Sequence, residues 1–249
     1  MNRRLPAAVQ HTGGMTRTAC EAKQHCNMEG NLVAALFDLD GTLIDTEGQY
    51  TRFWAEIGDD LIPDGHAFAL KVKGRTLKAI FEEFIPDPEV RRQVQQKLDD
   101  FEAQMQYPII PGALEFLEDL RRHGVHTAVV TSSNQEKMRN VAAKVPHLLA
   151  LFDRILTAED FSASKPAPDC YLLGARTFGA PVDRCMVFED APNGLQAGMN
   201  SGIFTVALTT GYSSEALGGL CHHTEPDFLG MSYERACQLL AGYNARSKS

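Results

Sequence analysis

The sequence predicts an α/β protein, a doubly wound, Rossmann-like parallel sheet with a small helical cap inserted after the first strand. Three observations predict this class. From residue 32 onward, short apolar runs alternate with stretches of helical periodicity, as they do in proteins with parallel sheets. The first run, Leu32–Phe37, is continuously apolar, which is typical of a strand buried on both faces. The interval 45–108 shows helical periods and no convincing strand.

The strands and helices of the core are predicted from apolar runs and from start and stop signals. Five strands are expected, at Leu32–Phe37, Thr127–Val130, Arg154–Thr157, Met186–Phe188 and Ile203–Leu208. Helices are expected at Pro111–Arg122, Pro168–Phe178 and Gly194–Ser201. A further helix is expected to begin at Ser133, because Ser133 and Glu136 have the spacing of a capping box.

The helical interval separates two parts of the core. Its helical periods cover Tyr50–Ile57, Leu77–Phe84 and Glu89–Met105. We therefore predict a cap domain at residues 45–108 and a Rossmann-like catalytic core at residues 31–44 and 109–249. Residues 1–30 have no hydrophobic period and are predicted to form a flexible N-terminal extension. Their arginines give them a faint similarity to an organellar transit peptide, and a start at Met28 is the simpler alternative.

Composition limits the partners and the compartment. The net charge of -8 over 249 residues argues against general affinity for nucleic acid or anionic membranes, which need basic faces. No apolar run approaches the ~18 residues that span a bilayer. The six cysteines form no CxxC pair, so reduced thiols and a cytoplasmic location are expected. A monomer or a weak homodimer is expected.

Polar side chains gather at the predicted carboxyl ends of the strands, where ligands bind in doubly wound sheets. They are Asp38 and Asp40 after the first strand, Thr131 and Ser132 after the second, Lys165 after the third, and Glu189 and Asp190 at the fourth. Crowded carboxylates repel one another unless a cation lies between them. Mg²⁺ binds carboxylates, waters and phosphate oxygens, and it is therefore the predicted cofactor.

These residue types predict phosphoryl transfer. Asp38 is expected to attack phosphorus, because carboxylates act as covalent nucleophiles toward phosphoryl groups. Asp40 is expected to protonate the leaving oxygen and then to deprotonate the hydrolytic water. Lys165 and Thr131 are expected to bind the phosphate as a point charge and a hydrogen-bond donor, with Ser132 as a further contact. The expected partner is a small phosphorylated metabolite.

The run from Asp38 to Glu47 resembles the first motif of the haloacid dehalogenase superfamily. Thr131, Lys165 and the pair Glu189-Asp190 are similar to the second, third and fourth motifs of that superfamily and follow in the same order. The resemblance extends from about Leu32 to Leu208. Four motifs in the right order identify the chain as a member of this superfamily far more specifically than the first motif does by itself.

The resemblance implies a metal site and a type of cap. Mg²⁺ is implied to be bound by Asp38, by Asp190 and by the backbone of Asp40, with Glu189 as a ligand or immediately behind one. The helical insertion is similar to the small cap of the β-phosphoglucomutase-like branch. Within the cap, Lys73-Gly74-Arg75 is the candidate substrate contact, because a glycine flanked by two cations can present donors to hydroxyls or to a second phosphate.

Three functions from different classes stay open at this point. The favoured one is hydrolysis of a small phosphomonoester, with a sugar phosphate as the first choice. A phosphosugar mutase is the alternative, but mutases of the resembling branch carry a histidine about five residues after the Asp45 position, where this chain has Tyr50. A phospho-aspartate receiver domain is the remote third, since receivers are about half as long and lack a helical insertion. Glycolate-type phosphates and pyrophosphate remain alternative substrates.

Overall fold

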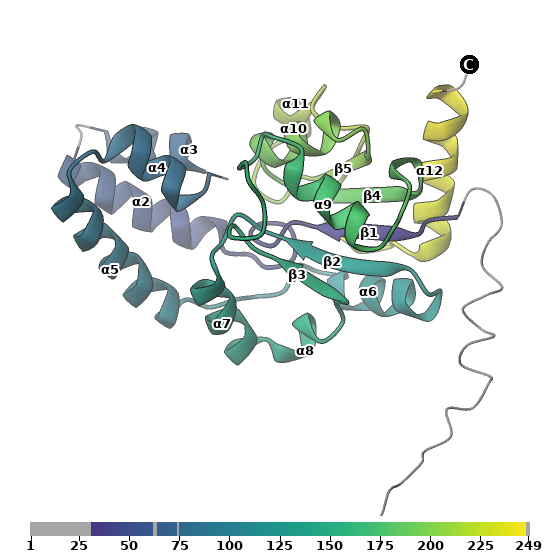
Figure 1. Cartoon of the computed structure of the whole chain (residues 1–249), viewed down its shortest axis with the longest axis horizontal. Helices are drawn as coiled ribbons and strands as arrows, with labels where there is room; N and C mark the ends of the chain where they lie inside the picture. Colours follow the sequence, from purple (N-terminus) through teal and green to yellow (C-terminus); the bar gives the residue numbers. More distant parts are fainter. Residues whose placement is uncertain (1–30, 62–63, 74, 248–249) are drawn as a thin grey trace, which may run out of the picture.

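The computed structural model describes residues 31–61, 64–73 and 75–247, so the predicted extension 1–30 lies outside the described residues. Figure 1 shows a sheet with helices on both sides and, beside it, a separate group of helices. None of the helices within these ranges is both long enough and apolar enough to cross a membrane.

Six parallel strands form the sheet, in the order β3-β2-β1-β4-β5-β6. They are β1 Ala34–Phe37, β2 His126–Val130, β3 Arg154–Leu156, β4 Cys185–Glu189, β5 Phe204–Leu208 and β6 His223–Glu225. The parallel sheet and its five predicted strands are confirmed. The edge strand β6 was not predicted, because its three polar residues give no apolar run. Since β1 pairs with both β2 and β4, the residues after these three strands meet at one edge.

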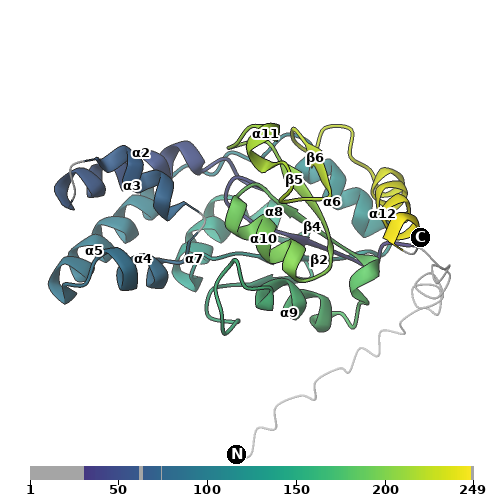
Figure 2. The ribbon, with the colours of Figure 1, turned by 90° about the horizontal axis from the view of Figure 1, so that it is seen from above.

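Helices cover both faces of the sheet. Successive side chains of a strand point to opposite faces, and the strands are buried on both, so both faces need a covering layer. They are α6 Ala113–Arg122, α7 Gln135–Lys144, α8 Pro146–Leu149, α9 Asp169–Thr177, η1 Val182–Arg184, α10 Pro192–Asn200, α11 Ser214–Leu217 and α12 Tyr233–Ser247. Ala35 and Phe37 pack toward α6 and α12, whereas Ala34 and Leu36 pack toward α9. Figure 2 shows α6 and α9 on opposite sides of the sheet.

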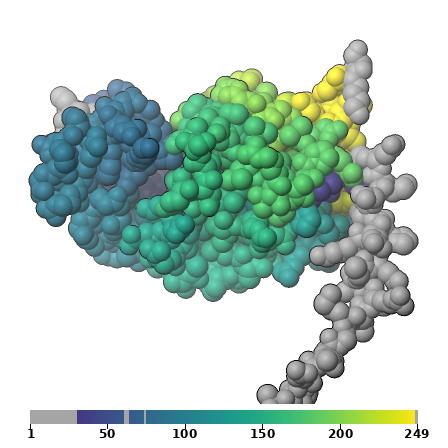
Figure 3. Space-filling view, viewed as in Figure 1, coloured from purple at the N-terminus to yellow at the C-terminus, as the bar shows by residue number. Residues whose placement is uncertain are grey.

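Within the described residues, four helices lie between β1 and α6 in the sequence, as predicted for an insertion after the first strand. They are α2 Glu47–Leu61, α3 Gly65–Val72, α4 Leu77–Phe84 and α5 Pro88–Gln104. They share an apolar cluster of their own, in which Phe53 packs edge-to-face on Trp54 and stacks on Phe101. Helix α3 was missed, because none of the predicted helical periods covers Gly65–Val72. In the space-filling view a hollow separates these helices from the sheet domain (Figure 3).

The predicted start of α7 is wrong by two residues. The helix begins at Gln135, and Asn134 is its N-cap, with a side-chain oxygen that accepts a hydrogen bond of 2.8 Å from the Lys137 backbone N–H. Ser133 lies before the helix, and its hydroxyl donates to the Asp40 carboxylate at 3.0 Å. A nearby carboxylate competes with the helix terminus for the same hydroxyl, and the sequence spacing cannot show which partner is closer.

Candidate active site

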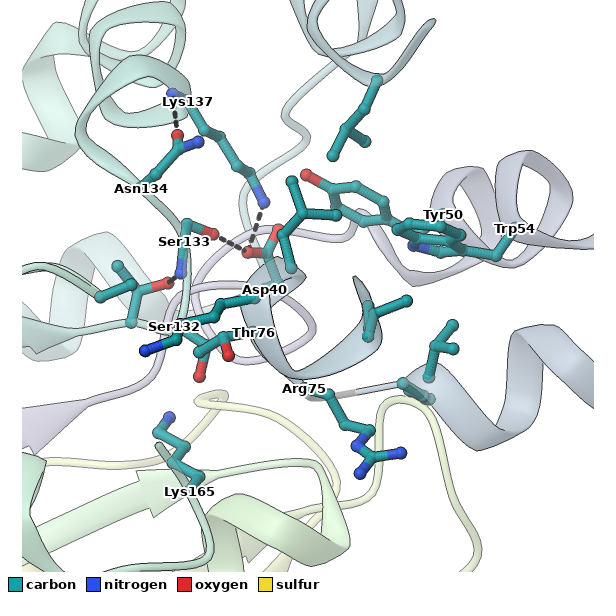
Figure 4. A pocket seen from close by; sticks show the side chains of 18 of the residues that line it. Asp40, Tyr50, Trp54, Arg75, Thr76, Ser132, Ser133, Asn134, Lys137 and Lys165 are labelled. Atoms are coloured by element: carbon teal, nitrogen blue, oxygen red, sulfur yellow. Dashed lines mark hydrogen bonds and ion pairs between the residues drawn. The ribbon is translucent and has the colours of Figure 1, made fainter. Parts of the chain in front are cut away.

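A cavity of about 550 Å³ lies between the strand ends and the helices α2 to α5. Its core wall contains Asp38, Asp40, Thr131, Ser132, Lys165 and Glu189. Side chains from both parts of the molecule face it in Figure 4. The strand register therefore brings together residues that are more than a hundred positions apart in the sequence.

The Asp38 carboxylate is tied to a buried lysine. Lys165 Nζ lies 2.5 Å from Asp38 Oδ1, 2.7 Å from Glu189 Oε1 and 3.2 Å from the Val130 carbonyl oxygen. Burial opposes the charge on Lys165, but attraction by Asp38 and Glu189 outweighs burial, so the pKa of Lys165 is raised and the ammonium persists. Lys165 binds Oδ1 of Asp38, and Asp38 also faces the cavity.

Glu189 is held by hydrogen bonds at both carboxylate oxygens. Its Oε1 accepts from Lys165 and, at 3.2 Å, from the Tyr171 hydroxyl. Its Oε2 accepts from the backbone N–H groups of Asp190 and Ala191, at 2.9 and 2.8 Å. A carboxylate with this many donors is rigid, so Glu189 is suited to orient the neighbouring groups.

Asp190 carries one of the two unpartnered polar atoms in the site. Its Oδ1 accepts from the Thr42 hydroxyl at 3.2 Å, whereas its Oδ2 is buried and has no hydrogen-bond partner in the described chain. Gly41 makes this packing possible, because it has a φ of 82° and a Cβ there would lie 2.3 Å from Asp190 Oδ2. The turn after β1 therefore presses directly against Asp190.

Asp38, Glu189 and Asp190 offer carboxylate oxygens within 4.8 Å of one another. Lys165 neutralises one of their three charges, which leaves two. Burial raises the pKa of Asp38 to about 8, with Lys165 opposing the shift, and burial together with the Glu189 charge raises the pKa of Asp190 well above its usual value. Two uncompensated charges and an unpartnered oxygen fit a hard divalent cation such as Mg²⁺.

Asp40 also lines the cavity, but its hydrogen-bond partners differ from those of Asp38, Glu189 and Asp190. Its Oδ1 accepts from the Thr46 hydroxyl at 2.5 Å. Its Oδ2 accepts from the Ser133 hydroxyl at 3.0 Å and from Lys137 Nζ (Figure 4). Three donors therefore hold a carboxylate whose side chain stays 19% exposed, so that it is oriented and still accessible from the cavity.

Thr131 and Ser132 follow β2 and line the same cavity. The Thr131 hydroxyl oxygen accepts from the Ser133 backbone N–H at 3.0 Å, which leaves its proton available to a ligand. The Ser132 hydroxyl is buried and has no hydrogen-bond partner in the described chain. A buried hydroxyl without a partner in the chain is rare in folded proteins, so Ser132 Oγ is a candidate contact for a bound ligand.

The predicted cap contacts are only partly described. Gly74 lies outside the described residues. Lys73 forms an ion pair with Glu47 at 2.7 Å and lies 4.0 Å from the centre of the Tyr212 ring. Arg75 forms an ion pair with Glu83. Both cations line the cavity, and each is already bound to a carboxylate.

Some site residues were missed by reasoning from the sequence. Lys137 and Thr46 both bind Asp40, and Tyr171 binds Glu189. Thr46 lies within the first motif segment, but only the folded turn brings its hydroxyl to Asp40. The sequence could have drawn attention to Lys137, because a cation in the first turn of a helix is disfavoured by the helix dipole and therefore suggests a specific partner. Nothing in the sequence distinguishes Tyr171 from other residues of its predicted helix.

Residues 32–202 match the family model of the haloacid dehalogenase-like hydrolases. The chain belongs to this family. Membership was predicted from Asp38, Thr131, Lys165 and Asp190, and the match covers all four. The family and the phosphatases among its relatives support assignment of the protein as a phosphoric monoester hydrolase.

Curated relatives of this hydrolase include named phosphatases. Validoxylamine A 7'-phosphate phosphatase of Streptomyces hygroscopicus subsp. limoneus is 32% identical over 74% of this chain and 88% of the relative. Hexitol phosphatase A of Escherichia coli is 33% identical over 70% of this chain and 81% of the relative. Protein SUPPRESSOR OF QUENCHING 1, chloroplastic, of Arabidopsis thaliana is 30% identical over 76% of this chain, and this chain spans 19% of its length.

The fold is shared with a β-phosphoglucomutase. The crystal structure of that enzyme from Clostridium difficile superposes with a TM-score of 0.70, covering 86% of this chain and 99% of the mutase at 20% identity. At this identity the likeness concerns the fold alone. It includes the arrangement of a parallel sheet with inserted helices.

Proposed function

We propose that this hydrolase is a Mg²⁺-dependent phosphatase that hydrolyses a small phosphomonoester through an aspartyl-phosphate on Asp38. The two unpartnered buried atoms of the site carry the proposal. Asp190 Oδ2 is an acceptor that suits a cation, and Ser132 Oγ is a donor that suits an anion. A metal ion together with a phosphate satisfies both atoms at once.

In the first step, an Asp38 carboxylate oxygen attacks phosphorus while the bond from phosphorus to the ester oxygen breaks. Asp40, which enters this step in its protonated form, gives its proton to that leaving oxygen. In the second step, Asp40 takes a proton from water as the water attacks the aspartyl-phosphate. The bond between Asp38 and phosphorus then breaks, inorganic phosphate is released, and both carboxyl groups return to their starting states. Lys165 and Thr131 stabilise the negative charge of the transferring group.

The metal would be bound by the carboxylates of Asp38 and Asp190 and by the backbone of Asp40, with Glu189 orienting them. When bound, Mg²⁺ supplies positive charge that offsets the phosphoryl oxygens and the crowded carboxylates. The raised pKa values of Asp38 and Asp190 support this assignment, because burial, together with the neighbouring carboxylates, disfavours their ionised forms, and a bound cation would offset that cost.

We infer a sugar phosphate or polyol phosphate as the substrate class. The phosphatases named above include one for hexitol phosphates, and a cavity of about 550 Å³ suits a ligand larger than phosphate. Residues 45–108 would then act as the cap domain over the core at 31–44 and 109–249, with residues 1–30 as an extension. The substrate contacts would be Ser132 of the core and Lys73, Gly74 and Arg75 of the cap.

A mutase is the second candidate, supported by the shared fold, but one observation favours hydrolysis. A mutase passes through a sugar bisphosphate, which needs a second set of cations for its distal phosphate. The cap cations that line the cavity already have partners, such as Glu47 for Lys73 and Glu83 for Arg75. Incubation with β-glucose 1-phosphate separates the two reactions: we expect free phosphate, and accumulation of glucose 6-phosphate without phosphate would establish the mutase.

A screen of phosphorylated metabolites tests the proposal directly. We expect phosphate release from at least one sugar phosphate or polyol phosphate, ranked by kcat/KM, and loss of that activity in EDTA with recovery on addition of Mg²⁺. Activity that survives complete chelation would contradict the metal site. No release from any monoester in the screen would contradict the phosphatase.

The proposal extends to the compartment, the oligomeric state and the partners of the protein. We infer a cytoplasmic enzyme that acts on small metabolites as a monomer or a weak homodimer, without nucleic acid or a membrane as partner. The acidic net charge and the free thiols of the described cysteines support it. Sedimentation at micromolar concentration and imaging of a C-terminally tagged protein provide the tests, and an organellar signal would contradict the compartment.

A further inference from the structure

A buried lysine outside the four motif positions binds the residue that carries the proton. Lys137 lies in the first turn of α7, and its side chain is 3% exposed. A cation in a first turn faces the positive end of the helix dipole, and burial removes its hydration, so both effects disfavour this position. The ion pair with Asp40 is what stabilises the ammonium there.

The Lys137 ammonium is also enclosed by the cap. It lies 4.4 Å from the centre of the Tyr50 ring, and the Tyr50 hydroxyl donates to Glu102 Oε1 at 2.7 Å. Tyr50 belongs to α2 and Glu102 to α5, whereas Lys137 and Asp40 belong to the sheet domain. Burial raises the pKa of Glu102, with attraction by Lys137 opposing the shift. In Figure 4 the ammonium points between Asp40 and the Tyr50 ring.

We propose that Lys137 is a positioning residue that couples the seating of the cap to the orientation of Asp40. While Tyr50 covers the ammonium, water is kept away and the donors of Lys137 are directed to Asp40. When α2 and α5 move away from the core, the ammonium gains water and its hold on Asp40 weakens. The inference rests on the proposed function, because Asp40 is the proton carrier of that reaction.

The consequence is specific to one part of the reaction. Phosphoryl transfer to Asp38 breaks the bond from phosphorus to the ester oxygen, and a basic leaving oxygen needs the Asp40 proton at that moment. The weakly basic 4-nitrophenolate leaves without it, whereas phenolate, whose conjugate acid has a pKa of about 10, benefits from it. Phenyl phosphate and 4-nitrophenyl phosphate have similar shapes, so their kcat/KM values separate proton transfer from binding.

The test compares Lys137→Met with Lys144→Met. Lys144 is a matched control: it lies on the same helix, donates to the carbonyl oxygens of Ala103 and Met105 and lies 5.5 Å from the Tyr107 ring, but its partners do not include Asp40. We expect Lys137→Met to lose at least about tenfold more kcat/KM on phenyl phosphate than on 4-nitrophenyl phosphate, since general acid catalysis contributes about 10²- to 10⁴-fold. Lys144→Met should keep the wild-type ratio.

Two further variants test the role of the cap and of the charge. Tyr50→Leu removes the ring over the ammonium and should shift the ratio in the same direction by a smaller factor. Lys137→Arg keeps a cation and should restore the ratio to within about threefold of wild type. Equal losses on both esters in Lys137→Met, or an unchanged ratio in a folded variant, would overturn the proposal.

A crystal structure of Lys137→Met gives a measurement that needs no turnover. We expect the Asp40 carboxylate to turn away from the Ser133 hydroxyl once its cation is lost. An Asp40 that keeps its contacts with Thr46 and Ser133 would overturn the positioning role. A wild-type protein that hydrolyses neither ester would contradict the phosphatase instead, so the two failures are distinguishable.

Discussion

Two walls of the cavity are built in different ways: the core wall at the strand ends, and the wall formed by the inserted helices α2 to α5, which we call the cap wall. At and directly behind the core wall, Asp38 and Asp190 are buried and accept hydrogen bonds from Lys165 and Thr42, which lie 127 and 148 residues away in the chain. On the cap wall, Lys73 and Arg75 pair with carboxylates of the same helical region. The side chains of the core wall are thus positioned by long-range contacts, whereas the two cap cations are positioned by contacts within the inserted helical region.

The largest expected effect is on the core wall. Asp38→Asn removes the proposed nucleophile while it conserves the shape of the side chain, and an amide oxygen would not form the proposed aspartyl-phosphate. We expect phosphate release to fall more than about a hundredfold in a variant whose thermal unfolding curve shows that it is still folded at the assay temperature. A variant that retains more than a hundredth of wild-type kcat would contradict the nucleophile role of Asp38 and the contrast between the two walls.

The next effect concerns the metal. Glu189→Gln keeps the size of the side chain but alters the hydrogen bonds that orient Asp190 and Lys165. Loss of such a supporting group weakens metal affinity by about 10- to 100-fold. A titration of activity against Mg²⁺ should show that rise in the half-saturating concentration, and an unchanged titration would assign Glu189 no part in the metal site.

A smaller effect is expected on the cap wall. Arg75→Ala should raise KM by about three- to tenfold for a sugar phosphate and leave kcat nearly unchanged, because uniform binding energy is lost without a change in the reacting groups. Steady-state kinetics measure both constants. A large fall in kcat with constant KM would place Arg75 in the transition state and would erase the contrast between the walls.

The smallest effect is a pH dependence of stability in the cap. A hydrogen bond from Arg75 lowers the pKa of Glu83. A lowered folded-state pKa stabilises the protein above the ordinary pKa of Glu, and this contribution disappears as pH falls through the lowered value. The difference in Tm between wild type and Glu83→Gln should therefore be present at pH 7 and should shrink as the pH is lowered below the ordinary pKa of Glu. A difference that grows on acidification would contradict the sign.

Reasoning from the sequence was most successful for the core. Leu32–Phe37 is apolar without interruption, and its last four residues, Ala34–Phe37, form β1 in the interior of the sheet. Edge elements carried less information: His223–Glu225 joins the sheet through backbone hydrogen bonds that its polar side chains do not reveal. Ser133 was assigned to a helix terminus because local spacing cannot register a carboxylate 93 residues away.

By itself, the sequence determined the family, the parallel sheet, the helical insertion and the acidic residues that follow its strands, because periodicity and motif order are properties of the chain. Only the tertiary structure decided how those residues are divided. It placed Asp38 with Lys165 and Asp40 with Lys137, and it left Ser132 and Asp190 each with one unpartnered buried atom. These pairings depend on strand register and on the position of the cap, which no local pattern encodes.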